Sequence, residues 1–489
     1  MDLLGWLAGG EYTIAREILL RGVAVLYVVA FVSAANQFPA LLGEHGLLPA
    51  PRFLRSAYGR AQPTLFGWRR KGQAIYSDRL LRAVAWSGAT LAALVVLGLP
   101  QLLPTWLFVP LFLVIWYLYL SIVNIGQTFY GFGWESLLCE AGFTVAFLGA
   151  ADTAPPITII VLLRWLVFRL EFGAGMIKMR GDRVWRDLTA LYYHHETQPM
   201  PNPLSRTAHL LPKWFHRIEV LGNHFAQLVV PWLLFLPQPV ASAAAAVVVL
   251  TQLWLVATGN FAWLNVITIV LAFSAVSDPV WSWALSWADG GARLGGIGAG
   301  GIPVWYAVAV LLVTAGLLVL SWPPLRNLFR RRQLMNASFN RWHLVNAYGA
   351  FGSVTRERYE VTVEGTADDP HDPHADWREY AFKGKPGDVR RLPRQFAPYH
   401  LRLDWLMWFL ALGSRDSPWF QGFLLRLLEA DRPTLRLLRA DPFGGEAPRA
   451  VRATMHLYRF TTRAEKRATG DRWVRTEVGT LVPPVSLRG

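Results

Sequence analysis

The sequence predicts a helical membrane protein with a soluble domain after its last span. Of its 489 residues, 53% are hydrophobic and 23 are tryptophan, which is typical of a multi-pass membrane protein. Nine apolar runs approach the roughly 20 residues that cross a hydrocarbon core. They lie near residues 18–35, 82–99, 102–123, 134–150, 157–177, 219–236, 239–257, 261–277 and 302–321. We therefore expect an α-helical bundle of about nine spans over residues 1–321 and a second domain over residues 322–489.

The second domain is predicted to be rich in β-strands and to resemble a β-sandwich. Five segments show the alternation of apolar and polar side chains that half-buried strands have: residues 359–364, 377–383, 434–438, 451–460 and 473–482. Residues 404–413 and 418–430 have helical spacing instead, so one or two helices are expected beside the strands. We also expect a surface loop over residues 368–376 and a Gly/Ala-rich connector over residues 288–301.

The charge and the cysteine count exclude several classes of protein. The single cysteine, Cys139, excludes a disulfide framework and a zinc thiolate site. The net charge is +15, but the arginines are scattered among acidic and aromatic residues, so membrane lipids rather than nucleic acid are the expected partner. Basic residues gather in residues 52–82, in residues 178–217 and at the start of the tail. The positive-inside rule then predicts a cytoplasmic tail.

The fifth predicted span carries charges where a membrane helix should be apolar. Arg164, Glu171 and Lys178 recur every seven residues, so they share one stripe of the helix, and Arg169 lies elsewhere on its circumference. An ionisable side chain inside a bilayer is costly and persists where it is paired, lines a polar cavity or has a function. We therefore expect the functional site on this helix.

Two glutamates in the preceding span, Glu135 and Glu140, are the expected partners of Arg164 and Arg169. One interpretation is a buried ion network that fixes the register of the helices. The other is a polar cavity that binds a substrate or a lipid headgroup. Both interpretations place these charges in the interior of the bundle.

A run of polar residues after the charged span is expected at the mouth of this cavity. It contains His194, His195, Glu196 and Gln198. Metal binding would require ligands that converge, and the sequence has neither the i, i+4 histidine spacing of zinc peptidases nor a second His/Asp cluster that points to this run. We therefore expect histidines held by hydrogen bonds and no metal site.

Two asparagines open the eighth predicted span, Asn260 and Asn265. An asparagine at membrane depth requires hydrogen-bond partners. Asn260 is expected either to cap a helix or, with Asn265, to contribute to the polar cavity.

A stretch of the tail is a candidate for partner binding. Arg402 and Asp404 share one face if the chain is extended there, and Trp405 and Trp408 would form an exposed anchor. The alternative is that this tryptophan-rich stretch packs the domain against the membrane.

The order of these motifs resembles the lipase maturation factor family over almost the full length of the chain. The matching segments are 36–37, 46–49, 134–142, 169–178, 185, 193–201, 258–261, 265, 346–351, 355–358, 364–365, 377–383 and 402–409. The resemblance implies a polytopic protein with chaperone-like action on client lipases, without catalysis and without a cofactor. It also implies the endoplasmic reticulum membrane and a lumenal tail for the animal members. The compact, arginine-rich chain with one cysteine favours a prokaryotic plasma membrane instead.

Residues 172–179, followed by Trp185, resemble more distantly the vitamin K-dependent gamma-carboxylase-like (HTTM) membrane superfamily. That resemblance implies an integral-membrane enzyme acting on a lipid or quinone-like substrate, with Lys178 as the base and the 194–196 run near the mouth. The alternative for Lys178 is that its ammonium group reaches the interface or pairs with Glu171.

Overall fold

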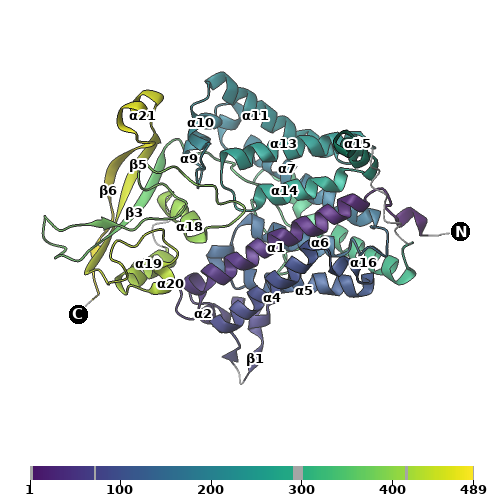
Figure 1. The fold of residues 1–489 in the computed structure, drawn as a ribbon, viewed down its shortest axis with the longest axis horizontal. Helices are drawn as coiled ribbons and strands as arrows, with labels where there is room; N and C mark the ends of the chain where they lie inside the picture. The colour runs from purple at the N-terminus through teal and green to yellow at the C-terminus, as the bar shows by residue number, and fades with distance from the viewer. Residues whose placement is uncertain (1–3, 71–72, 290–300, 414–416, 488–489) are drawn as a thin grey trace.

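The computed structural model describes residues 4–70, 73–289, 301–413 and 417–487. Figure 1 shows a helical bundle with a small sheet domain at one end. The long helix α1 (Thr13–Leu42) packs against α4 (Asp78–Val96), α6 (Gly133–Ala146) and α14 (Leu264–Ala272). The other helices of the bundle are α2 (Ala50–Arg55), α3 (Ala57–Arg60), α5 (Thr105–Val123), α7 (Ile157–Arg180), α8 (Arg183–Arg186), α9 (Leu191–Thr197), α10 (Ser205–His209), α11 (Lys213–Leu228), α12 (Val230–Leu233), α13 (Val240–Thr258), α15 (Asp278–Asp289), α16 (Val304–Leu320) and α17 (Trp322–Leu328). A short hairpin, β1 (Arg69–Arg70) and β2 (Gln73–Ala74), precedes α4.

The crossing of α1 and α6 depends on a glycine. A Cβ atom on Gly142 would lie 1.7 Å from the hydroxyl oxygen of Tyr27. That hydroxyl donates a hydrogen bond to the carbonyl of Leu138, 3.1 Å away. Only glycine lets the two helices approach this closely, as small residues do in membrane bundles. The close approach positions α6 and its two glutamates at the centre of the bundle.

The number of spans differs from the sequence prediction. Within the described ranges, five helical segments are long and apolar enough to cross a membrane, namely α1, α4, α5, α13 and residues 304–328. A pair of helices, 264–275 and 278–284, would add a sixth, although it is bent by 107°. The nine expected spans are thus not confirmed.

The three expected spans that are missing from this set have identifiable reasons. Helix α6 has 14 residues and rises only about 21 Å, short of the ~30 Å of a hydrocarbon core. Helix α7 is long enough but carries several charged side chains, and the run at 219–236 is divided between α11 and α12.

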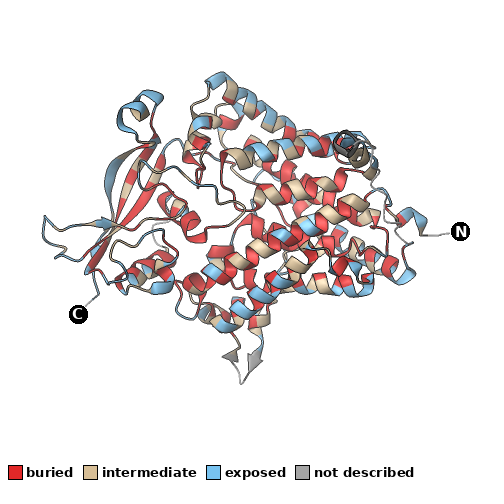
Figure 2. Ribbon diagram, viewed as in Figure 1, coloured by how far each residue is buried: buried red, intermediate tan, exposed pale blue. Residues whose placement is uncertain are grey.

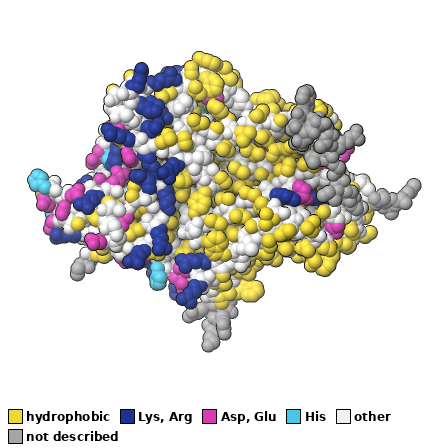
Figure 3. Space-filling model, in the orientation of Figure 1, with side chains coloured by type: hydrophobic (Ala, Val, Ile, Leu, Met, Phe, Trp, Pro, Cys, Tyr) yellow, Lys and Arg dark blue, Asp and Glu magenta, His cyan; other side chains and the backbone are white. Residues whose placement is uncertain are grey.

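The surface of the molecule has two chemically different regions. Figure 3 shows hydrophobic side chains covering the bundle, with Lys and Arg side chains gathered towards the sheet domain. Exposed apolar residues on the bundle include Leu250, Leu312 and Val319, each more than 60% exposed. A surface of this kind is compatible with lipid, and the basic side chains then lie where anionic headgroups would meet them.

The C-terminal region forms one antiparallel sheet rather than a sandwich. The strand order is β4 (Arg378–Glu379), β3 (Arg358–Thr366), β5 (Ala450–Phe460) and β6 (Trp473–Val485). Along β3 and β5, Val361 pairs with Met455 and the register is regular over nine residue pairs. Helices α18 (Arg402–Ala411) and α19 (Pro418–Leu428) pack on β3 and β5 from the side of the bundle (Figure 1). The described residues of the tail contain no second packed sheet, because these helices cover that face.

Most of the predicted elements of the tail are found. Strands occur at 359–364, 451–460 and 473–482, and helices occur at 404–411 and 418–428. Only Arg378–Glu379 of the segment 377–383 is a strand. Residues 434–438 are not a strand, because Asp431 caps a short helix, α20 (Arg432–Leu435), by accepting a hydrogen bond from the backbone of Thr434. A further helix, α21 (Arg463–Thr469), joins β5 to β6.

The loop at 368–376 is as expected, and the connector at 288–301 lies for the most part outside the described residues.

The bundle and the sheet domain share a hydrophobic core. One cluster of buried side chains includes Leu26 and Val167 of the bundle, Trp405 of α18 and Val363 of β3. Figure 2 shows buried residues through the bundle and along the sheet domain. The domain boundary near residue 321 stays a prediction.

Candidate functional site

The first glutamate of α6 pairs with the C-terminal domain. Glu135 is completely buried and forms an ion pair with Arg402, the first residue of α18. It also accepts a hydrogen bond from the hydroxyl of Tyr119, and the Nδ1 atom of His400 lies 3.3 Å from its Oε1 atom. Arg402 donates a second hydrogen bond to the carbonyl of Phe129, 2.9 Å away. The predicted pairing of Glu135 with an arginine of the bundle is therefore wrong, because its ion-pair partner is Arg402 of the tail.

The second glutamate of α6 joins the charged helix to the tail. Glu140 forms the predicted ion pair with Arg169. Its Oε2 atom also accepts hydrogen bonds from the backbone N–H of Asn346, at 2.9 Å, and from the hydroxyl of Tyr348, at 2.7 Å. Arg169 in turn donates to the carbonyl of Asn346 at 2.6 Å. The buried carboxylate is thus satisfied by groups from both parts of the chain.

Arg164 has a different role from the one predicted. Its guanidinium donates to the carbonyls of Ser274, at 3.1 Å, and Leu234, at 3.3 Å, and lies 5.0 Å from the ring of Tyr12. Neither Glu135 nor any other described acidic side chain forms an ion pair with it. Backbone carbonyls therefore hold this cation and tie α7 to the neighbouring helix ends.

A cavity of about 890 Å³ lies between the bundle and the C-terminal domain. Its walls come from α7, α9, α11, α13 and α14 of the bundle, from residues 348–353, and from α18 and the start of α19. Five of the predicted cavity residues line it, namely Glu171, Lys178, His194, His195 and Asn265. The volume is within the range of small-molecule sites, which is about 300–1,000 Å³.

The polar wall of the cavity is a chain of charged and amide side chains. Gln252 donates to Glu171 at 2.6 Å and accepts from the side-chain amide of Asn265 at 2.7 Å. The Nζ atom of Lys178 donates to Gln227 at 2.8 Å and to Asn223 at 3.3 Å. The expected pairing of Lys178 with Glu171 is replaced by these amide contacts. The amides of Gln252, Gln227 and Asn223 are not evident from the sequence, because a single glutamine or asparagine in a helix has no pattern that distinguishes a buried position from an exposed one.

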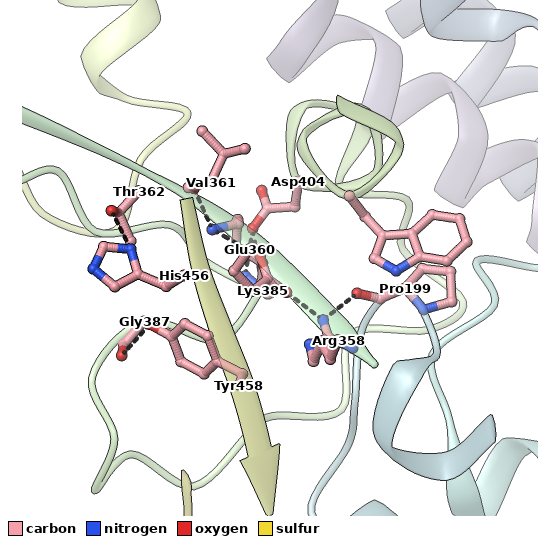
Figure 4. A network of polar contacts seen from close by, with 12 residues as sticks. Pro199, Arg358, Glu360, Val361, Thr362, Lys385, Gly387, Asp404, His456 and Tyr458 are labelled. Atoms are coloured by element: carbon pink, nitrogen blue, oxygen red, sulfur yellow. Dashed lines mark hydrogen bonds and ion pairs between the residues drawn. The ribbon is translucent and has the colours of Figure 1, made fainter. Parts of the chain in front are cut away.

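The polar run after α7 is fastened to the sheet. Arg358 of β3 donates to the carbonyls of Glu196 and Gln198. It also donates to the carbonyl of Pro199 and pairs with Glu360 (Figure 4). The carboxylate of Glu196 accepts a hydrogen bond from the backbone N–H of Phe460, at 2.6 Å. Glu196 and Gln198 therefore connect the bundle to the sheet and do not line the cavity.

The amide of Asn260 joins three segments. It donates to the carbonyls of Pro201, at 3.2 Å, and Arg394, at 2.9 Å, and accepts from the backbone N–H groups of Phe396 and Ala397. Asn260 does not cap a helix and does not line the cavity. It fixes the turn between α13 and α14 to the C-terminal domain.

The candidate partner-binding stretch is buried. Residues 402–405 begin helix α18 rather than an extended segment, and Arg402, Asp404 and Trp405 are at most 3% exposed. Burial raises the pKa of the Asp404 carboxyl, which accepts hydrogen bonds from the backbone N–H groups of Gly384 and Lys385. The exposed anchor is therefore wrong for Trp405, which lines the cavity together with Trp408. This placement agrees with the alternative of domain packing, and contact with a partner stays a prediction.

The two histidines differ in their surroundings. His194 stacks on Phe261 with the ring planes 10° apart and meets Phe351 edge to face. His195 faces His216 and Glu219 of α11, and among the described residues its ring nitrogens find no hydrogen-bond partner. The hydrogen bonds expected for His195 are thus not present.

Fold and site together define a multi-pass membrane protein whose C-terminal domain is docked on the bundle by a buried ion pair and buried hydrogen bonds. The model of the lipase maturation factor transmembrane domain matches residues 14–283, and that of the lipase maturation factor C-terminal domain matches residues 344–483. The chain belongs to the lipase maturation factor family.

Several curated relatives match nearly the whole chain. It is 40% identical to lipase maturation factor 1 of Bos taurus, over 99% of this chain and 91% of that protein. It is 39% identical to lipase maturation factor 1 of Homo sapiens, over 98% of this chain and 89% of that protein. Identity to lipase maturation factor 2 of Gallus gallus is 31%, over 96% and 81%. No solved structure matches the chain.

The ion pair between Arg402 and Glu135 can be tested by substitution. We expect Arg402→Met to destabilise the protein in detergent by about 3–5 kcal/mol, because it leaves the buried carboxylate of Glu135 without its arginine partner. Adding Glu135→Gln to this variant should restore part of the lost stability, as measured by chemical denaturation. The control is Arg390→Met, which breaks an exposed pair with Asp471 and should cost no more than about 1 kcal/mol. Equal losses from Arg402→Met and Arg390→Met would contradict this account.

The stability of the junction should depend on pH through His343. Its Nδ1 atom lies 2.9 Å from the hydroxyl of Ser136 and its Nε2 atom 3.0 Å from Oδ1 of Asn124, which suits a neutral ring. Burial lowers the pKa of His343 to about 4, against the raising effect of Glu135. In the unfolded chain this histidine takes up a proton near pH 6.5. Its contribution to the free energy of unfolding is therefore complete above about pH 7. It is lost as the pH falls towards 4, by at most about 3 kcal/mol.

Thermal unfolding between pH 8 and 4 measures this effect. His343 has a φ of +52°, a conformation that asparagine adopts readily, so His343→Asn is the suitable variant. It should flatten the loss of stability between pH 6.5 and 4. His371→Gln, in the exposed loop, should leave the pH profile of the wild type unchanged. A profile that His343→Asn does not alter would exclude His343 as its source.

Proposed function

We propose that the chain assists the maturation of a lipase in a chaperone-like manner. Its relatives are named lipase maturation factors, and the similarity covers both the bundle and the C-terminal domain. In this proposal the client binds through apolar side chains at the cavity between the two parts, and the bundle anchors the complex in the membrane.

The observation that carries the proposal is that both parts of the chain contribute apolar side chains to one open cavity. Trp254 and Leu250 come from α13, and Phe409 comes from α18. They are 41%, 66% and 40% exposed, so the rim of the cavity is available for contact. Large aromatic side chains provide much of the contact energy in protein recognition. A client segment that is not yet folded would offer matching apolar groups.

The proposal requires one particular orientation of the chain in the membrane. An exported lipase folds outside the cytoplasm, so the C-terminal domain must face that side. The count of basic residues predicts the opposite side, and the location in a prokaryotic plasma membrane likewise stays a prediction. The enzymatic alternative with Lys178 as a base rests on the short segment 172–179, and no contact of Lys178 favours it.

Rescue of a client lipase tests the proposal. The full chain would be expressed with a secreted lipase of the lipoprotein lipase type in cells that lack their own lipase maturation factor. We expect the wild type to raise secreted lipase activity per amount of lipase. Trp408→Ala, in the cavity wall, should reduce this gain several-fold at an equal level in the membrane. The matched control is Trp106→Ala, since Trp106 is 60% exposed on α5 and does not line the cavity.

A third variant separates the chaperone from the enzyme. Lys178→Met should retain rescue if the chain acts without catalysis, and should abolish it if Lys178 is a base. No rescue by the wild type, or equal losses from Trp408→Ala and Trp106→Ala, would count against the cavity as the site of action.

A further inference from the structure

Two histidines and a glutamate from different helices converge beside the cavity. His195 belongs to α9, and His216 and Glu219 lie in the first two turns of α11. One ligand atom from each residue lies within 4.8 Å of the other two. His195 and Glu219 also line the cavity, so the cluster can be reached from outside.

The polar contacts of His216 place a lone pair of its ring opposite a lone pair of the Glu219 carboxylate. Its Nε2 atom lies 3.3 Å from the carbonyl oxygen of His209, an acceptor, so Nε2 carries a proton. In a neutral ring the Nδ1 atom then has a free lone pair, and it lies 2.8 Å from a carboxylate oxygen of Glu219. Two acceptors at this distance require either a proton between them, on the ring or on the carboxyl, or a metal ion near both.

His195 offers a third donor to the same place. Its Nε2 atom lies 3.9 Å from the Oε1 atom of Glu219. The residue is 3% exposed, and neither ring nitrogen has a hydrogen-bond partner within the part of the chain that the structure describes. A buried polar atom without a partner costs free energy, and a neutral imidazole is a common metal ligand.

We infer that His195, His216 and Glu219 bind a divalent transition-metal ion of the Zn²⁺ type, with an open coordination position towards the cavity. Two imidazole nitrogens and one carboxylate oxygen form a known zinc donor set that leaves a fourth position free. Ligand atoms of a tetrahedral zinc site lie about 3.3 Å apart, as follows from metal–ligand distances near 2.0–2.1 Å. The Nδ1 atom of His216 lies 2.8 Å from Oε2 of Glu219, and the Nε2 atom of His195 lies 3.9 Å from Oε1. A rotation of the carboxylate and small shifts of the two rings therefore complete the site around one oxygen.

The surroundings of the cluster resemble those of a metal site. The carbonyl of His209 orients the ring of His216, and the indole N–H of Trp254 donates to Glu219 at 2.7 Å. Such outer contacts commonly fix metal ligands in position. The ion would tie α9 to α11. The sequence pattern did not predict it, because the second histidine and the glutamate follow the first histidine by more than twenty residues.

Zinc binding by the purified full chain tests the inference. After removal of metals with a chelator, the protein in mild detergent would be titrated with Zn²⁺ against a chromophoric chelator. We expect one tightly bound equivalent. His195→Leu and Glu219→Gln should each weaken binding more than about 100-fold, since even loss of an outer contact costs about 10–100-fold. The control removes both histidines of the exposed loop, His371→Ala and His374→Ala, and should keep the wild-type affinity.

Thermal unfolding separates loss of the site from loss of the fold. Leucine at position 195 replaces a ring whose nitrogens are buried and unpaired, so His195→Leu without zinc should melt at or above the wild-type temperature. Zinc should raise the melting temperature of the wild type and of the loop variant only. The inference fails if the wild type retains no zinc, if His195→Leu retains it as tightly, or if the loop variant loses it.

Discussion

The architecture depends on two buried carboxylates of α6. Glu135 and Glu140 lie in the interior of a bundle where an unpaired charge would be very costly. Arg169 and Tyr119 of the bundle supply two of the partners, and Arg402, His400 and the segment 346–348 of the tail supply the others. The tail is therefore required for the electrostatic balance of the bundle, and the cavity forms where the two parts meet.

The sequence identified the charged helix and much of its environment. The heptad spacing of Glu171 and Lys178 correctly placed both on one wall, and the ion pair of Arg169 with Glu140 follows from their positions in neighbouring helices. Strands β3, β5 and β6 were predictable because the sequence alternates apolar and polar side chains over at least six residues in each of them. These features depend on local periodicity, which a single sequence contains.

The remaining features depend on contacts between distant segments. Nothing near Glu135 in the sequence indicates that Arg402 reaches it, and an arginine in a tryptophan-rich stretch is equally compatible with a surface anchor. Arg164 differs from its predicted role for a related reason, since carbonyls at helix ends replace an acidic partner. Nine spans were expected because apolar length alone does not distinguish a membrane span from a short buried helix such as α6.

Hydrogen exchange of the full chain in detergent tests the central claim most directly. If Glu135 anchors the C-terminal domain, the backbone amides of α18 should exchange as slowly as those of α6, because they open only with the docked core. Exchange of residues 402–411 at the rate of the exposed loop 368–376, with α6 still protected, would show that the domain is not held by this ion pair.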